Sequence, residues 1–199
     1  GHANGFDQSS PGQIVNWVLF SLLTITTGLV WERRRGLLSR LVGAGVRGVE
    51  IIGGKMLTMV ALTVLQQVFL ILLGQLAFGV DYFNNVGAVA LVVISLSVLA
   101  AAMGLLVTSL FRTEQAVIAT TILAAQLLAA LGGAWFPLEV TSSTFSRVAH
   151  YLPTAWVIDS FHGIILKGWG VAEVASALTV TWAWAVFFFI LAVWRFRVQ

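Results

Sequence analysis

The stretch 86-VGAVALVVISLSVLAAAMGLLVTSLF-111 decides the fold class, because it contains no Asp, Glu, Lys or Arg. The hydrocarbon core of a bilayer is about 30 Å thick, and a helix needs about 20 apolar residues to cross it. A helix also pairs its backbone N–H and C=O groups within the segment, as a lipid environment requires. The stretch is therefore predicted to be a transmembrane helix.

Four further stretches resemble it in length and composition. The whole chain of 199 residues is 59% hydrophobic and only 10% charged, whereas a soluble domain has about a quarter of its residues charged. None of the stretches alternates apolar and polar residues as the strands of a membrane barrel do. The sequence thus predicts an all-α, polytopic membrane bundle of five transmembrane helices. The predicted spans are residues 12–31, 56–79, 86–111, 115–134 and 171–194.

The basic residues predict how the bundle is oriented. Residues 32–55 carry six of the eleven Lys and Arg, and three more follow the third and fifth spans. Only Arg147 and Lys167 lie in the segments on the opposite side. Cytoplasmic loops of membrane proteins are enriched in Lys and Arg. We therefore expect a multi-pass protein of the cell membrane with its N-terminus outside and its C-terminus in the cytoplasm.

The segments between the spans are predicted to contain short helices. Residues 1–11 are a polar tail on the outer side, and residues 12–199 form one transmembrane domain. In the cytoplasmic loop 32–55, Leu37, Leu38, Leu41 and Val42 recur at helical spacing, which favours a helix lying in the membrane interface. On the outer side, residues 135–170 contain two prolines and apolar patches too short to span, a pattern typical of short re-entrant helices.

Residues that could carry chemistry in this chain are scarce. It has no Cys, three scattered His and no Gly-rich phosphate loop followed by Lys. The spans lack paired carboxylates, and they lack the mid-span charge that an ion-coupled carrier usually needs. We therefore expect neither catalysis nor a cofactor or metal in this chain. A net charge of only +3 also gives no reason to expect nucleic acid as a partner.

Three glutamines lie inside the predicted spans, namely Gln66, Gln67 and Gln126. Amide side chains in a bilayer often form hydrogen bonds between helices, worth about 1 kcal/mol each. We favour that interpretation over a second one, in which the three glutamines line a substrate path. Both interpretations remain open from the sequence.

Three segments together resemble a known family. They are 32-ERRRGLLSRL-41, which has the pattern Glu-Arg-x-x-Gly-x-x-x-x-Leu, the outer turn 131-LGGAWFPLE-139, and 151-YLPTAW-156. In this order and spacing, the chain resembles the permease subunits of type-two ATP-binding-cassette exporters, over nearly its whole length. Such permeases usually have six spans. The resemblance, like the odd number of spans, implies that the chain holds the last five helices and that the first one is missing.

The resemblance also implies a mechanism and partners. Two permease copies, identical or related, would form a dimer in membrane lipid, and a separate cytoplasmic ATPase would hold ATP and Mg²⁺. The exported substrate would be a hydrophobic drug, a lipid-like molecule or a polysaccharide. The residues implied in coupling to the ATPase are Glu32, Arg33, Gly36, Arg40, Arg47 and Glu50. Those implied in the outer re-entrant turn are Gly133, Phe136, Pro137 and Pro153.

Two other classes of function remain open beside this one. The lack of mid-span charge would also suit a membrane scaffold or assembly factor that transports nothing. An ion-driven carrier is a weaker alternative, because such a carrier usually needs a charged residue in the middle of a span.

Overall fold

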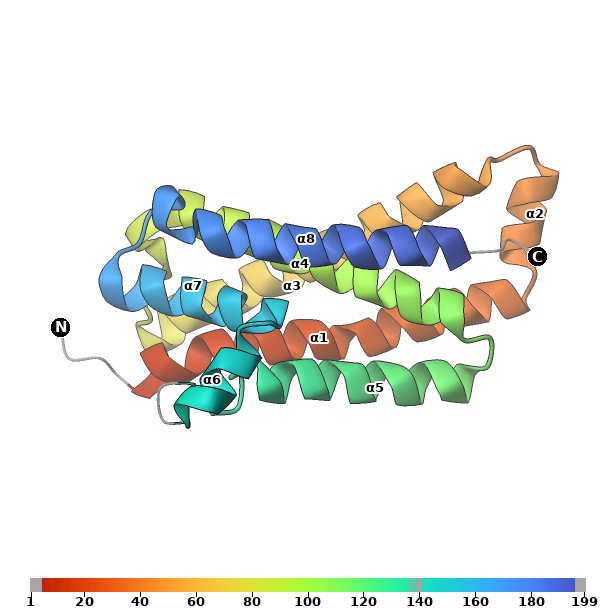
Figure 1. The fold of residues 1–199 in the computed structure, drawn as a ribbon. Coiled ribbons are helices and arrows are strands. Elements are labelled where there is room, and N and C mark those ends of the chain that lie inside the picture. Colours follow the sequence, from red (N-terminus) through yellow and green to blue (C-terminus); the bar gives the residue numbers. More distant parts are fainter. Residues whose placement is uncertain (1–4, 137, 139–140, 196–199) are drawn as a thin grey trace.

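The computed structural model describes residues 5–136, 138 and 141–195, and these residues form helices joined by short turns (Figure 1). No strand occurs in this part of the chain. The helices are α1 (Gly5–Arg34), α2 (Leu37–Gly43), α3 (Gly48–Phe78), the 3-10 helix η1 (Tyr82–Asn85), α4 (Val86–Leu110), α5 (Glu114–Leu131), α6 (Ser143–Ala149), α7 (Pro153–Lys167) and α8 (Val171–Arg195).

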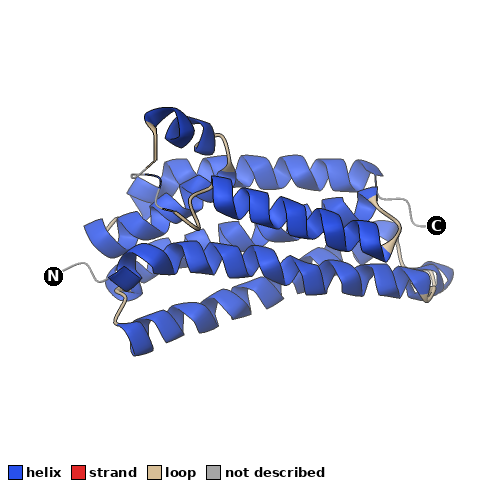
Figure 2. Ribbon diagram, turned by 90° about the horizontal axis from the view of Figure 1, so that it is seen from below, coloured by secondary structure: helices blue, strands red, loops and turns tan. Residues whose placement is uncertain are grey.

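The five predicted spans are confirmed as five long, apolar helices: α1, α3, α4, α5 and α8. Figure 2 shows them running side by side, with the short helices at the two ends of the bundle. In the most apolar part of α4, 72% of the residues are buried within the protein, against 22% for α3, α5 and α8. Helix α4 is thus the centre of the bundle, and the other three present most of their apolar surface outward.

Close packing around α4 follows from its sequence. Its buried residues include branched side chains and also the small Ala100, Ala101, Ala102 and Gly104, which let neighbouring helices approach. Gly104 faces α1 so closely that a Cβ there would lie 3.3 Å from the side chain of Leu22. Helix α8 packs along most of α4, and α1 and α3 pack on its other sides.

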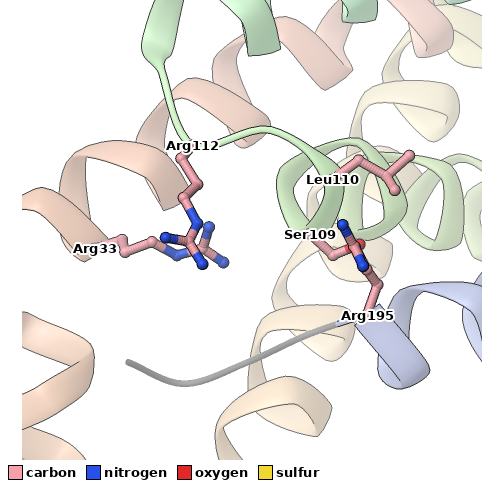
Figure 3. A pocket seen from close by; sticks show the side chains of 5 residues that line it. All are labelled: Arg33, Ser109, Leu110, Arg112 and Arg195. Atoms are coloured by element: carbon pink, nitrogen blue, oxygen red, sulfur yellow. The ribbon is translucent and has the colours of Figure 1, made fainter.

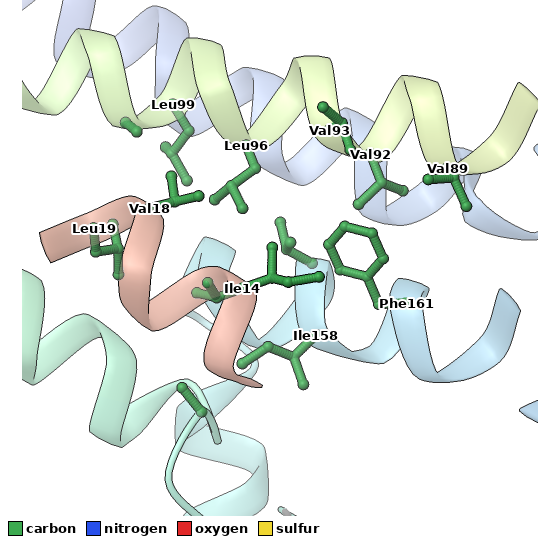
Figure 4. Packing of buried hydrophobic residues seen from close by; sticks show 14 of the residues in the cluster. Ile14, Val18, Leu19, Val89, Val92, Val93, Leu96, Leu99, Ile158 and Phe161 are labelled. Atoms are coloured by element: carbon green, nitrogen blue, oxygen red, sulfur yellow. The ribbon is translucent and has the colours of Figure 1, made fainter. Parts of the chain in front are cut away.

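Helix α7 returns into this core at the end of the bundle opposite α2. Figure 4 shows Phe161 and Ile158 of α7 directed toward the branched side chains of α1 and α4. Both are almost fully buried. Pro153 occupies the first turn of α7, where its missing N–H leaves no hydrogen bond unmade. This arrangement is the one expected for a short helix that enters the bundle and turns back.

The ends of several helices differ from the sequence prediction. Residues 5–10 were predicted as part of a polar tail, but α1 begins at Gly5 and continues through Pro11. Contacts to other elements hold this turn in place: the hydroxyl groups of Ser10 and Tyr82 lie 2.6 Å apart, and the rings of Phe6 and Phe78 lie 4.8 Å apart. Tertiary contact therefore outweighs the usual helix-breaking effect of proline.

Helices α3 and α5 also differ from their predicted limits. Helix α3 begins at Gly48 rather than at residue 56, because the Glu50 carboxylate accepts a hydrogen bond of 2.9 Å from the backbone N–H of Arg47 and caps the helix. Helix α5 ends at Leu131 rather than at residue 134. Gly133 follows it with φ of 90°, a left-handed conformation that ends a helix and favours glycine.

Candidate coupling site at the basic end of the bundle

The predicted coupling residues gather where α1 ends and α3 begins. Helix α1 ends at Arg34, and Gly36 then takes a left-handed conformation with φ of 68°, at which the chain turns away from the axis of α1. Helix α2 crosses the end of the bundle from there (Figure 1). The backbone at Gly36 therefore sets the angle between α1 and α2, because other residues rarely adopt this conformation.

An ion pair joins the two long helices that flank α2. The Glu32 carboxylate in the last turns of α1 pairs with the Lys55 ammonium of α3, and both side chains are about one-third exposed. A cavity beside this pair is lined by both residues and by Leu37, Leu38, Arg40 and Leu41 of α2. The pairing of Lys55 with Glu32 was not predicted, because nothing in the local sequence shows that the two residues face each other.

Helix α2 presents two different faces. Leu38 is almost completely buried against the bundle, whereas Leu37, Leu41 and Val42 are each about 40% exposed. An exposed apolar stripe of this kind suits a membrane interface or a partner protein. Arg40, on the same helix, is also exposed. The structure thus leaves one apolar and basic face of α2 open.

The remaining coupling residues fall into two groups. Arg47 and Glu50 are exposed and are joined by the cap of α3. Arg33, the next residue of α1 after Glu32, faces α4, where its Nη1 donates a hydrogen bond of 3.0 Å to the Thr108 carbonyl. Arg33 therefore anchors α1 to the central helix.

The three glutamines of the predicted substrate path are not brought together. Gln67 is fully buried, and its Nε2 donates hydrogen bonds to Ser97 Oγ at 2.7 Å and to the Val93 carbonyl at 3.2 Å, both on α4. Gln66 Nε2 donates to the Trp17 carbonyl of α1 at 3.1 Å. Gln126 is partly buried on α5, on the far side of α1. The first two glutamines thus act as links between helices.

The predicted outer turn lies at the opposite end of the bundle. Gly133 packs against the Leu138 side chain, Phe136 is exposed and Pro153 is buried at the start of α7. Thr154 Oγ1 donates a hydrogen bond of 2.8 Å to the Leu128 carbonyl, which ties α7 to the end of α5. Pro137 lies outside the described residues.

A histidine network at this end was not predicted from the sequence. His150 Nδ1 lies 2.7 Å from the Ser146 carbonyl, and Nε2 lies 2.7 Å from the Asp159 carboxylate. Both partners are acceptors, so they are best satisfied when both ring nitrogens carry protons. Burial alone lowers the pKa of His150, but the hydrogen bonds to Ser146 and Asp159 outweigh it and the pKa is raised. Trp156 Nε1 also donates to the His150 carbonyl.

These features define a helical membrane subunit with an exposed short helix at its basic end. A family model described as ABC-2 family transporter protein matches residues 10–194. The chain therefore belongs to the ABC-2 family, as a permease subunit of the ATP-binding-cassette transporters. The resemblance drawn from the sequence motifs is confirmed.

Two curated proteins are similar to the chain. "ABC transporter G family member 20" of Dictyostelium discoideum is 27% identical over 190 residues, which are 94% of this chain and 26% of that protein. "Linearmycin resistance permease protein LnrN" of Bacillus subtilis is 26% identical over 175 residues, 86% of this chain and 45% of that protein. The chain thus spans less than half the length of either relative. No solved structure matches it significantly.

Proposed function

We propose that the chain is the transmembrane subunit of an ATP-driven exporter and that a separate ATPase binds at α2. The observation that carries this proposal is the open face of α2, held by Glu32 and Lys55 between the two long helices α1 and α3. A force applied to α2 would reach both α1 and α3, because short turns and packing tie α2 to each of them. Interfaces of this kind transmit rigid-body movement.

The proposal includes the partners and the orientation. The ATPase holds ATP and Mg²⁺, and this chain contributes no catalytic group. The N-terminus lies outside and the C-terminus in the cytoplasm, so that α2 faces the ATPase. A second permease copy, identical or related, completes the transporter. The outward apolar faces of α3, α5 and α8 supply surface for this copy and for lipid.

The proposed substrate is hydrophobic, either a drug-like or a lipid-like molecule. The spans are apolar, and Gln66 and Gln67 make hydrogen bonds between helices. The name of the Bacillus subtilis relative records linearmycin resistance, which favours a drug-like compound for this chain over a polysaccharide.

Transport in inside-out membrane vesicles from cells that make the complete transporter tests the proposal. The probes are a fluorescent hydrophobic dye and a fluorescent phospholipid, with vesicles lacking this chain as the control. We expect uptake that requires ATP hydrolysis and persists when ionophores dissipate the proton and sodium gradients. Uptake that ionophores abolish and ATP removal does not would establish an ion-driven carrier. ATP hydrolysis by the purified complex without movement of any candidate substrate would favour the scaffold.

A further inference from the structure

A cavity of about 350 Å³ lies between the beginning of α1 and the end of α3, at the end of the bundle opposite α2. Most of its walls are apolar or aromatic. Trp17 and Leu73 at its mouth are each about half exposed, whereas Ile14 and Val80 at its floor are buried. Helices α1 and α3 are both long and apolar enough to cross a membrane. A ligand could therefore reach the cavity from the membrane.

Contacts between α1 and α3 close the cavity at both ends. At one end the rings of Phe6 and Phe78 lie 4.8 Å apart. At the other end the Trp17 carbonyl accepts a hydrogen bond of 3.1 Å from Gln66 Nε2. A helix with its side chains is about 10–12 Å wide and needs a groove that is open along its length. Small-molecule sites start at about 300 Å³, so the closed cavity suits a small molecule better than a partner helix.

One amide group in the cavity has no hydrogen-bond partner. Gln13 lines the cavity, and its side chain makes no hydrogen bond with the described part of the chain. The two serines beside it are already bonded: Ser9 Oγ donates to the Gly5 carbonyl at 2.9 Å, and the hydroxyl groups of Ser10 and Tyr82 lie 2.6 Å apart. An amide can both donate and accept, so a carbonyl or hydroxyl group on a ligand would satisfy Gln13.

The lining also indicates the charge of the ligand. Among the described residues, none that lines this cavity is charged. The cavity at the basic end of the bundle differs, since Arg33, Arg112 and Arg195 line it (Figure 3). An ion would lose its hydration between α1 and α3 without an opposite charge to offset the cost. The aromatic walls favour contact with another ring, and an acyl chain has no group that could pair with Gln13.

We propose that this cavity binds the exported compound, an uncharged aromatic molecule with a hydrogen-bonding group, and that Gln13 pairs with that group. Few polar groups within apolar and aromatic walls are typical of small-molecule sites. The proposal rests on the proposed transport function only in naming the ligand as the exported compound. Binding itself needs no ATP and can be measured separately.

Photolabelling of the purified complete transporter in nonionic detergent, without ATP, tests the site. The probe is benzophenone, an uncharged, photoreactive aromatic ketone whose carbonyl can accept a hydrogen bond from an amide. Mass spectrometry locates the labelled residues. We expect saturable labelling of residues at the cavity, such as Leu70 and Leu73. Labelling confined to other helices would overturn the proposal.

Competitors identify the chemistry that the cavity recognises. Benzanilide is uncharged and aromatic and carries an amide, whereas diphenylmethane has two rings and no hydrogen-bonding group. Benzanilide should displace the probe at a concentration about threefold to tenfold lower than diphenylmethane does, which corresponds to one hydrogen bond. In the Gln13→Leu variant this difference should disappear. Displacement by phosphatidylcholine as effective as that by benzanilide would mean that the cavity holds a lipid, and it would contradict the proposal.

A substitution that fills the cavity provides a second test. Leu73→Trp adds bulk at a half-exposed position, so the fold should survive, which thermal unfolding checks. Labelling should fall by about tenfold, the effect of roughly two methylene groups kept out of contact. Leu76→Trp is the matched control, because Leu76 is 82% exposed on the same helix and does not line the cavity. Equal losses in the two variants would show that the label does not report on this cavity.

Transport by the same variants separates this proposal from the proposed function. If the cavity is labelled as expected but the vesicles show no ATP-driven uptake, the binding site is correct and the export function is wrong. If uptake is normal and Leu73→Trp changes neither labelling nor uptake, the export function is correct and this cavity is not the binding site.

Discussion

At the scale of single residues, the Glu32–Lys55 pair is the contact most directly tied to the proposed coupling. Partly exposed ion pairs contribute only about 0–1 kcal/mol to stability, so the pair does not hold the bundle together by itself. Its position matters more than its energy, since it joins α1 to α3 on either side of α2. In the sequence Glu32 and Lys55 are charges of one loop, and the turns on either side of α2 bring them face to face.

Reversing one charge of this pair should impair transport more than folding. Glu32→Lys places two ammonium groups together, and we expect ATP-driven transport to fall by about fivefold or more, the lower end of a typical coupling free energy. The unfolding temperature should change little. The double variant Glu32→Lys with Lys55→Glu should restore transport. The measurements are vesicle transport and thermal unfolding of each variant.

Arg34→Glu is the control for this prediction. It reverses a charge of the more exposed pair between Arg34 and Glu114, which joins α1 to α5 rather than to α3. If Arg34→Glu reduces transport as strongly as Glu32→Lys does, or if the double variant fails to recover, the coupling role of the pair is wrong.

The His150 network predicts a dependence of stability on pH. The pKa of His150 is raised in the folded protein above its ordinary value of 6.5, so the charged ring stabilises the fold. This contribution is complete below pH 6.5 and is lost as the pH rises through the folded pKa. The pair is partly exposed, so its full value is about 1 kcal/mol or less.

Thermal unfolding of wild type and His150→Gln between pH 5 and pH 9 measures this contribution. The difference in unfolding temperature should be largest at low pH and should shrink as the pH rises. His162→Gln is the control, because the His162 ring bonds to the uncharged carbonyl of Gln8. If the difference in unfolding temperature between wild type and His150→Gln grows as the pH rises, the raised pKa of His150 is wrong.

At the scale of elements, the junction between α1 and α2 depends on one backbone conformation. Gly36→Ala forces a residue with a Cβ into the left-handed region, which costs about 1–2 kcal/mol. We expect lower thermal stability and a weaker response of transport to ATP, because the angle of α2 changes. Gly43→Ala is the control: Gly43 ends α2 without a positive φ, and no atom lies near its added Cβ. Equal effects of both variants would show that the conformation of Gly36 is unimportant.

A second glycine tests how α1 packs at the other end of the bundle. A Cβ at Gly12 would collide with the backbone carbonyl of Ala134, and backbone cannot move aside as a side chain can. Gly12→Ala should therefore destabilise the protein by about 1–3 kcal/mol, the usual cost of overpacking. Gly28→Ala on the same helix meets no atom and should be tolerated. Thermal unfolding distinguishes the two, and an unaffected Gly12→Ala protein would contradict the packing of α1 against residue 134.

The middles of the long helices and the ends of α4 and α8 could be predicted from the sequence, but the starts of α1 and α3 and the end of α5 could not. Long uncharged runs such as residues 86–111 decide which segments can cross a bilayer, whatever the tertiary structure. The beginning of α1 depends on contacts such as Ser10 with Tyr82, and that of α3 on the cap by Glu50. His150 and Asp159 likewise lie nine positions apart on different elements, so local spacing does not pair them.

At the scale of the whole molecule, the bundle has a buried centre and two different ends. Helix α4 is buried along most of its length, while α3, α5 and α8 have mostly exposed apolar surface. One end is closed by α6 and α7, and the other presents α2 and most of the basic residues (Figure 1). The chain belongs to the ABC-2 family of transporter proteins. The proposed ATPase binds at the α2 end.

Photo-crosslinking in native membranes tests this account most directly. A photoreactive amino acid is placed at Leu41 on the open face of α2 or, as the control, at Tyr151, which is 77% exposed at the opposite end. The crosslinked products are identified by mass spectrometry. We expect an ATP-binding-cassette ATPase to be captured from Leu41 and not from Tyr151. Capture of such an ATPase from Tyr151 alone, or from neither position while the transporter remains active, would contradict it.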